Sequence, residues 1–569
     1  MQIEQAETVA DNSPTLWTRA LSEEFWGGVV SPLMFSLAGG LIEERMVQKG
    51  VRLAGLKELR REKFLRLSCG RVYVNCRILE EICRLVPSAL LVPELLRILP
   101  AEVRDRLAGV RVPLLSFRTL RMAARFFALD PDWAPFSNYR SFQRAVRRLE
   151  GGAAGPVGPS SNTREDLPDL LARIRRTCSE LGSFLDIVIW GMIFAYVLHP
   201  LTAILARRWA GDAREQLAAS LTVGLDGIRT FEINREIESL AEAVDADSFL
   251  EELFRCADAE EILRSLAAAP GAAAFRQRFQ TFLGRHGHRF RARDLSHPTW
   301  RERPQMVVEL IQKNRRADRS RRSLPVQKEK REHAEAELKR RMRGSRFGVL
   351  KRALFSLCLF YDRKYFALRE NMRYYADMHL ERCRRYYLEI GSRWKAAGLL
   401  GAEEDIFYLT REEVEGSPTG EGVREAAEKR KADYGTYHRI RAPKIIREGA
   451  VAPELPPIPE DEQLELFGEV ASPGTAHARA RVIRRPQDLL EFQRGEILVA
   501  EYTDPSWTPV LPMAAGLVLC LGGLLSHGSI IAREYGIPAL IHVAGALQRI
   551  RTGDSLWMNA DQGKVRIER

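Results

Sequence analysis

A chain of 569 residues is too long for a single hydrophobic core, so its length predicts two to four domains. An apolar fraction of 45% excludes a chain that is disordered throughout. The formal net charge of +12 comes from 87 basic and 75 acidic residues that are interspersed, which is too diffuse to indicate a specific nucleic-acid site.

The number and spacing of the cysteines bear on the cellular compartment of the protein. None of the eight forms a Cys-x-x-Cys pair, and no secretory leader is recognisable. The seven-residue spacing of Cys69, Cys76 and Cys83 favours one face of a helix over a metal site, and no metal ligands are predicted elsewhere. We therefore expect reduced thiols in a cytoplasmic protein.

Residues 1–448 are predicted to be mostly helical. Apolar residues recur at three- and four-residue spacing in the segments 84–130, 163–205, 233–284 and 350–398. The most apolar part, 184–205, is interrupted by His199 and Pro200, and its unbroken run is shorter than the roughly 20 residues that span a bilayer. This pattern predicts a buried helix that ends near Pro200, and no membrane span.

Residues 313–346 are strongly basic, and their second half mixes Glu with Lys and Arg at helical spacing. Such a segment is typical of a solvated helix with a loop, and it lacks the aromatic side chains on which single-stranded nucleic acids stack. A protein that binds a polyanion or a membrane surface through this segment is the less favoured alternative.

The composition changes at residues 449–464, where four prolines and several acidic residues predict a semi-rigid linker. Beyond it, short apolar runs bounded by Gly, Pro and Asp predict strands, and the last two predict a hairpin: 495–503, 515–523, 537–543, 554–560 and 563–569. A helix of about ten residues is predicted after His527. The predicted fold class is therefore α+β multidomain, with a large, mostly α-helical region followed by a small α/β domain at residues 465–569.

His527 stands where a glycine-rich turn runs into this helix. A neutral imidazole is a good nucleophile near pH 7, and its attack on a phosphoryl group gives a phosphohistidine. Backbone N–H groups at a helix start stabilise a phosphate, and Gly522 and Gly523 let the chain approach one closely. Ser526 can donate a hydrogen bond, and Arg533 can bind the phosphate or form a surface ion pair. The alternative is that His527 merely caps the helix.

The segments TDPSWTP, residues 503–509, and GGLLSHGSIIAREYGIPAL, residues 522–540, resemble the phosphohistidine swivelling domain of phosphoenolpyruvate-utilising enzymes. The likeness is greatest to rifampicin phosphotransferases and phosphoenolpyruvate synthase-like proteins, whose motif reads GG-x-x-[ST]-H-G followed by IARE-x-G-x-P. In that family the histidine carries a phosphoryl group between distant sites. The resemblance implies that His527 is the carrier, with an open face beside the helix start. Its setting would be Gly522, Gly523, Ser526, Gly528 and Arg533.

Upstream, residues 16–33, 286–300 and 405–410 resemble the helical middle region of the same enzymes, which holds the acceptor. This implies four candidates for acceptor binding, one of which would act as general base: His286, His288, Arg289 and Asp294. A polar loop packed for structure is an equally good interpretation of each. The sequence departs from the family at Ala292, where an acidic residue is common, and at His542, where relatives usually have glycine.

The resemblance also implies an ATP-grasp domain in front of the helical region. No Walker-type loop or other site for Mg·ATP is recognisable in the sequence, so no cofactor is expected on this chain, and ATP and Mg are expected on a partner. The resulting hypothesis is a phosphotransferase component that takes its phosphoryl group from an ATP-grasp protein in trans and delivers it to a small-molecule acceptor. The alternative is a non-catalytic regulatory or binding protein that retains the swivelling domain.

Overall fold

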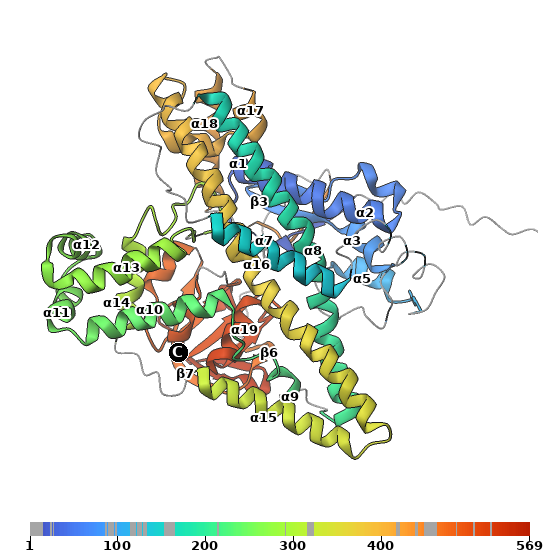
Figure 1. The fold of residues 1–569 in the computed structure, drawn as a ribbon. Helices are drawn as coiled ribbons and strands as arrows, with labels where there is room; N and C mark the ends of the chain where they lie inside the picture. The colour runs from blue at the N-terminus through green and yellow to red at the C-terminus, as the bar shows by residue number, and fades with distance from the viewer. Residues whose placement is uncertain are drawn as a thin grey trace, which may run out of the picture.

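The computed structural model describes residues 15–85, 99–113, 134–152, 166–212, 216–315, 324–416, 422–438, 442–448 and 464–568, with residues 88, 96, 121, 124 and 128 singly and short gaps at 23–25, 27, 291, 485, 504–506 and 524–525 (Figure 1). The predicted linker and most of the predicted helix 84–130 lie outside these residues. Helices predominate, and two sheets accompany them.

The helical region, defined here as residues 15–448, is built around two long helices, α8 (Leu167–Ala210) and α16 (Gly348–Ala396). The two run antiparallel, because Thr202 contacts Cys358 while Phe184 lies against His379. They cross the middle of the molecule in Figure 1. The helices predicted at 163–205 and 350–398 are thus confirmed.

The prediction that the first of these helices ends near Pro200 is wrong, since α8 continues to Ala210 and ends at Gly211 with a φ of 67°. A proline inside a helix removes a hydrogen bond and costs about 3 kcal/mol. Packing of α8 along α16 offsets this cost, which no local pattern reveals. By length and composition α8 would also suffice to cross a membrane, and 39% of its most apolar window is buried.

The predicted helical segment 233–284 forms four helices, α10 (Arg229–Asp245), α11 (Ser248–Cys256), α12 (Ala259–Ala268) and α13 (Ala273–His286). Asp247 and Asp258 divide the segment, because their carboxylates accept hydrogen bonds from the backbone of the next helix and so cap its start. Among the described residues, the remaining helices of the helical region are α1 (Pro32–Met34), α2 (Lys49–Ala54), α3 (Cys76–Cys83), α5 (Ala101–Leu107), α7 (Pro135–Gly152), α9 (Gln216–Ala219), α14 (Gln305–Asn314), α15 (Leu324–Arg343), α17 (Arg411–Glu415) and α18 (Gly422–Tyr437). Shorter or π-type turns are η2 (Phe35–Gly39), η3 (Ile42–Gln48), η4 (Lys57–Arg61), η5 (Pro270–Ala272) and η6 (Glu403–Tyr408).

The helical region also contains an antiparallel sheet that the sequence analysis did not predict. Its order is β2-β3-β1-β4, with β1 (Leu16–Thr18), β2 (Leu65–Ser68), β3 (Arg71–Asn75) and β4 (Ile445–Arg447). Its strands are three to five residues long, which is too short for a clear two-residue alternation. Cys69 lies in the turn between β2 and β3 with a φ of 47°, so the prediction that it shares a helix face with Cys76 and Cys83 is wrong.

The α/β region, defined here as residues 464–568, holds an eight-stranded sheet of order β5-β12-β11-β7-β8-β9-β10-β6. The strands are β5 (Glu465–Phe467), β6 (Glu469–Ser472), β7 (Thr475–Ile483), β8 (Ile497–Ala500), β9 (Gly516–Leu519), β10 (Ala539–Ile541), β11 (Ser555–Asn559) and β12 (Lys564–Glu568). The helices are α19 (His527–Tyr535) and α20 (Ala546–Arg549), with turns η7 (Pro486–Glu491), η9 (Leu511–Met513) and η10 (Ala560–Gln562). All five predicted strands, the β11–β12 hairpin and the helix after His527 are confirmed.

The strands β7 to β10 are parallel, and the three strands β8, β9 and β10 are buried on both faces, as parallel strands usually are. Alternate residues point to opposite faces, so Ile497 and Val499 join the region's own core while Leu498 and Ala500 join the larger core that continues into the helical region. One apolar face of the sheet is therefore directed toward the helices.

Candidate functional site

The turn before α19 places His527 as the first residue of that helix. Gly522 has a φ of 126°, which side-chain-bearing residues rarely adopt. The Ser526 amide and the Ser529 hydroxyl both donate to the Gly523 carbonyl, at 2.9 and 2.8 Å, and Ser526 is the N-cap residue. The glycines thus allow a tight turn whose hydrogen bonds fix the start of the helix.

Gly528 has a steric role. A Cβ atom at this position would lie 2.5 Å from Thr503 Oγ1 and 2.9 Å from Leu519 Cδ1. Only glycine therefore lets the first turn of α19 lie against residue 503, which belongs to the other segment of the family motif.

The His527 side chain is buried at the boundary between the two regions. Its Nε2 lies 2.8 Å from Thr508 Oγ1, and its Nδ1 lies 3.7 Å from Glu370 Oε2 on α16. The prediction of an open imidazole face is wrong for this arrangement, since only 4% of the side chain is exposed. The capping alternative is also wrong, because Ser526 is the cap residue and the imidazole is directed toward Thr508 and Glu370. The histidine of the α/β region therefore faces the helical region.

Glu370 is held as a carboxylate. Burial by itself raises its pKa, but the imidazole of His527 and the guanidinium groups of Arg369 and Arg373 outweigh burial and bring the pKa below its usual value. Arg369 Nη1 donates to Glu370 Oε1 at 3.0 Å. An ionised carboxylate can only accept, so it favours the tautomer with hydrogen on Nδ1 and leaves the Nε2 lone pair to accept from the Thr508 hydroxyl.

Arg533 is half-buried, and Nη1 donates to the Ala471 carbonyl at 3.1 Å. Burial, followed by repulsion from Arg369, lowers its pKa to about 10, and Glu370 acts in the opposite direction. Arg533 is thus a cation at pH 7. Two arginines, one from each region, lie near the Glu370 carboxylate.

Polar contacts join the two regions around this point. Asn234 on α10 donates to the Thr508 carbonyl at 3.2 Å and to the Tyr535 hydroxyl at 3.0 Å, and Asn314 donates to the Pro509 carbonyl at 3.2 Å. The amide of Gly224 donates to both oxygens of a glutamate on α19, Glu534. The α/β region lies among α10, α15 and α16 in Figure 1, and the apolar core continues across the boundary.

Two of the acceptor-binding candidates, His286 and His288, lie against Tyr374 on α16. His286 Nδ1 is 3.0 Å from the Tyr374 hydroxyl, and the His288 ring centroid is 4.4 Å from the Tyr374 ring centroid. Tyr374 follows Glu370 by one helical turn, about 6 Å along the axis. Burial, with the charge of Arg289, lowers the pKa of His288 well below its usual value, so that imidazole is neutral. Both histidines are buried, and both lie against the residue that follows Glu370 by one helical turn.

The other two candidates have structural partners. Arg289 Nη1 donates to Asp377 Oδ2 at 2.5 Å in a buried ion pair. Asp294 accepts from the Ser31 amide at 2.7 Å and from the Ser296 amide at 2.8 Å. These contacts favour the interpretation of Arg289 and Asp294 as residues that hold the loop in place.

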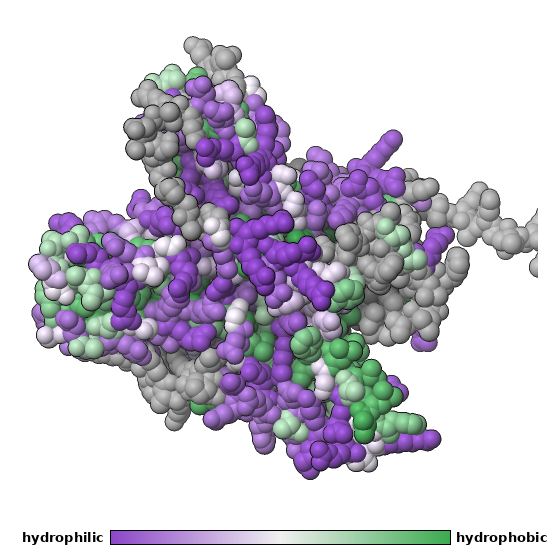
Figure 2. All heavy atoms as spheres, in the orientation of Figure 1, coloured by the Kyte–Doolittle hydropathy of each residue, from purple (hydrophilic) through white to green (hydrophobic). Residues whose placement is uncertain are grey.

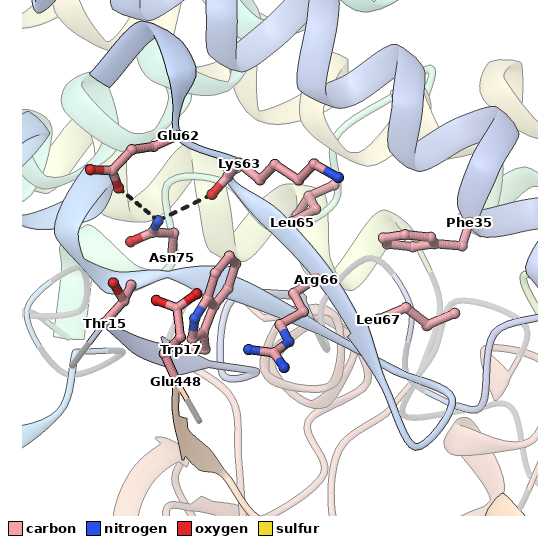
Figure 3. Close-up of a pocket in the computed structure, with 10 residues that line it drawn as sticks. All are labelled: Thr15, Trp17, Phe35, Glu62, Lys63, Leu65, Arg66, Leu67, Asn75 and Glu448. Atoms are coloured by element: carbon pink, nitrogen blue, oxygen red, sulfur yellow. Dashed lines mark hydrogen bonds between the residues drawn. The ribbon is translucent and has the colours of Figure 1, made fainter. Parts of the chain in front are cut away.

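A pocket of about 690 Å³ opens elsewhere, on the small sheet (Figure 3). Trp17 lies in its middle, and Asn75 donates to Glu62 and to the Lys63 carbonyl. The remaining lining residues are Thr15, Phe35, Leu65, Arg66, Leu67 and Glu448. None of the predicted site residues lines this pocket.

The sequence analysis missed Glu370, Arg369 and Thr508. Thr508 lies inside the motif at 503–509, so its position beside the histidine was available from the resemblance. Arg369 and Glu370 lie within a long amphipathic helix, where charged residues are normally solvated. The burial of both side chains distinguishes them from solvated residues, and only the tertiary structure shows it.

Comparison with known families finds two matches. Residues 187–370 match the fourth domain of rifampicin phosphotransferase, and residues 492–563 match the mobile domain of phosphoenolpyruvate-utilising enzymes. The first match ends at Glu370, and the second contains Thr508 and His527. The two sides of the site described above therefore come from two matched regions.

Curated relatives agree with these matches. The chain is 29% identical over 370 residues to rifampicin phosphotransferase of Streptomyces sviceus, which covers 63% of this chain and 42% of that protein. It is 30% identical over 446 residues to the prodigiosin synthesizing transferase PigC of Serratia marcescens, with coverage of 75% and 48%. It is 38% identical over 110 residues to phosphoenolpyruvate synthase of Aquifex aeolicus, with coverage of 19% and 13%. The chain thus spans about half the length, or less, of these relatives.

Proposed function

Because these two matches place the chain in the phosphoenolpyruvate-utilising enzyme family, we propose that it is a phosphotransferase component in which His527 carries a phosphoryl group to a small-molecule acceptor. The observation that supports this proposal most directly is the position of His527, whose Nδ1 lies 3.7 Å from Glu370 on the other matched region. A carrier that delivers its group to the helical region must be able to reach that region.

In this proposal the two nitrogen atoms of the His527 imidazole have different roles. In the loading step the Nε2 lone pair attacks phosphorus, so that a P–N bond forms and the donor's P–O bond breaks. In the delivery step an acceptor hydroxyl oxygen attacks phosphorus, the P–N bond breaks, and the hydroxyl proton passes to a base. Glu370, within 3.7 Å of Nδ1, stabilises the protonated nitrogen opposite the one that reacts.

The acceptor would bind along α16 beside Glu370. Arg369 and Arg533 supply positive charge for the transferring phosphoryl group, as phosphoryl transfer requires. The neutral imidazole of His288, next to Tyr374, is suited to accept the hydroxyl proton. Because both His527 and His288 are buried in this arrangement, the acceptor can enter only after the α/β region moves away.

The same movement would expose His527 to a donor. We propose that the donor is an ATP-grasp domain on a separate protein, which holds ATP and Mg. The segment 449–464, rich in proline, would act as the tether between the two positions.

The burial of His527 also favours a second function. A histidine enclosed by Thr508 and Glu370 suits a binding or regulatory protein in which the docked α/β region is the functional state and no phosphoryl group is passed. The two proposals differ in one observable, a phosphohistidine at residue 527.

The test is incubation of the chain with a candidate ATP-grasp protein, magnesium and radiolabelled ATP, followed by mass spectrometry for acid-labile phosphate. The proposal predicts label on His527 and none in His527→Ala.

His542→Ala is the matched control, because His542 lies in the same region but is partly exposed and paired with Glu469 at 3.3 Å. Label that survives in His527→Ala, or that disappears in His542→Ala alone, contradicts the carrier proposal. Absence of label with every ATP-grasp protein that accompanies the chain in its source organism favours the regulatory function.

A further inference from the structure

The first three turns of α16 are apolar on two opposite faces. Phe355 and Leu359 are buried in a cluster with Leu338 and Met342 of α15 and with the end of α8. On the other side, six large apolar side chains are 46% to 75% exposed: Phe347, Val349, Leu350, Leu354, Leu357 and Phe360. We call these six residues the apolar face. A helix with apolar side chains on two opposite faces normally packs against a partner on each of them.

The apolar face lies at the outer end of the long helices. Figure 2 shows hydrophobic side chains gathered over the lower halves of α8 and α16, away from the α/β region. Ile193 on α8 is also exposed. Contiguous apolar surface of this kind marks an interaction site on a folded protein.

The backbone at the turn between α15 and α16 supports the same conclusion. Phe347 has a φ of 62°, a left-handed conformation that is unfavourable for a residue with a Cβ atom. Its ring is exposed, with the Arg346 guanidinium carbon 5.2 Å from the ring centroid. A strained backbone that presents an exposed aromatic side chain stabilises no core, so the strain points to a role at the surface.

The charge around the apolar face is mostly basic. Residues 338–361 contain seven basic residues and no acidic residue: Lys339, Arg340, Arg341, Arg343, Arg346, Lys351 and Arg352. The first three of them form ion pairs with Glu335 and Glu337 on α15, so the basic charge nearest the apolar face comes from the other four. Arg207 and Arg208, exposed near the end of α8, add to the same end of the molecule. Exposed Phe and Leu beside a cluster of Lys and Arg are the composition of elements that lie in an anionic membrane interface.

We propose that the turn between α15 and α16, with the apolar face of α16, binds the surface of a bilayer that contains anionic phospholipids. Phe347, Val349 and Leu350 would enter the boundary between headgroups and acyl chains, and the surrounding Arg and Lys would bind lipid phosphates. A second copy of the chain fits less well, because a symmetric contact would bring the basic residues nearest the apolar face of each copy together. Binding to a surface requires no membrane span and does not depend on the phosphotransfer proposed above.

The test is co-sedimentation of the full chain with phosphatidylcholine vesicles, with and without phosphatidylserine. We expect binding to the anionic vesicles that weakens with added salt. Leu350→Ser/Leu354→Ser is expected to lose binding to the anionic vesicles. Arg346→Glu/Lys351→Glu is expected to lower the partition coefficient at least about tenfold on anionic vesicles.

Matched controls are Phe249→Ser on α11 and Arg264→Glu on α12, which change an exposed apolar and an exposed basic residue at a different place. Thermal unfolding verifies that each variant is folded, and the charge reversals remain informative if the serine variant is not. The proposal is overturned if the chain stays in solution with anionic vesicles or if the controls weaken binding as much as the variants. It is also overturned if light scattering shows a dimer that Leu350→Ser/Leu354→Ser dissociates while vesicles do not bind.

Discussion

At the scale of single residues, Glu370 connects the two regions of the molecule. It is buried, ionised and 3.7 Å from the imidazole of His527. At that distance the contact is electrostatic, and it must shorten by about 1 Å to become a hydrogen bond. Glu370 is therefore a positioning residue, which sets the tautomer and orientation of the histidine in the docked position.

This role gives a prediction for Glu370→Gln, which keeps the size of the side chain and removes its charge. Delivery of phosphate to the acceptor is expected to fall by about tenfold to a hundredfold, the usual effect of losing such a partner. Loading of His527 by the donor is expected to be unchanged, since it takes place away from α16. Single-turnover labelling and delivery assays separate the two steps.

Glu370→Asp serves as the conservative control and is expected to retain part of the delivery rate. A variant that loses loading and delivery equally would show that Glu370 supports folding and not orientation.

Backbone conformation explains two residues that the sequence comparison singles out. Gly522 needs a φ of 126°, so the first glycine of the motif is a conformational requirement. His542 has a φ of 56°, which explains why relatives usually have glycine there. The departure at His542 thus costs this chain some backbone strain and leaves the site at His527 unchanged.

At the scale of elements, α16 is the central helix of the molecule. It contacts α8, α15, the turn η6 and the α/β region. Close approach of η6 depends on Gly391, where an added Cβ would lie 2.2 Å from the Glu403 carbonyl oxygen. That oxygen belongs to the backbone and cannot rotate away.

Gly391→Ala is therefore expected to reduce the free energy of unfolding by about 1–3 kcal/mol, the usual cost of overpacking. Gly284→Ala in α13 is the control, because no atom lies within 4 Å of its added Cβ. The control is expected to stabilise the protein by up to about 1 kcal/mol through helix propensity. Urea unfolding measures both, and equal effects at the two positions would refute the packing argument.

At the scale of the whole molecule, docking of the α/β region on the helical region buries an ionisable group, the carboxyl group of Glu534. Burial raises the pKa of Glu534 to about 7, although the Gly224 amide and Arg331 lower it. The docked state therefore holds a proton that an undocked Glu534, with a pKa near 4.5, releases. Docking is strongest below pH 4.5 and weakens as the pH rises to about 7.

Small-angle scattering is expected to show a larger radius of gyration at pH 8 than at pH 5. Glu534→Gln, which stays neutral, is expected to remain compact at both values. If the variant expands with pH as the wild type does, the effect belongs to other groups, such as the titrating histidines.

Local patterns in the sequence by themselves determined five of the eight strands of the α/β region, the hairpin and the helix at His527, because alternation and turn residues are local signals; the strands β5, β6 and β7 were not predicted. The glycine-rich motif likewise singled out His527, the residue for which we propose the carrier role. Only the tertiary structure decided that α8 continues past Pro200, that residues 15–448 include a sheet, and that Glu370 faces His527. The packing of α8 on α16, the pairing of β1 with β4 and the approach of Glu370 to His527 each join residues more than a hundred positions apart, and no pattern within one helix or strand records them.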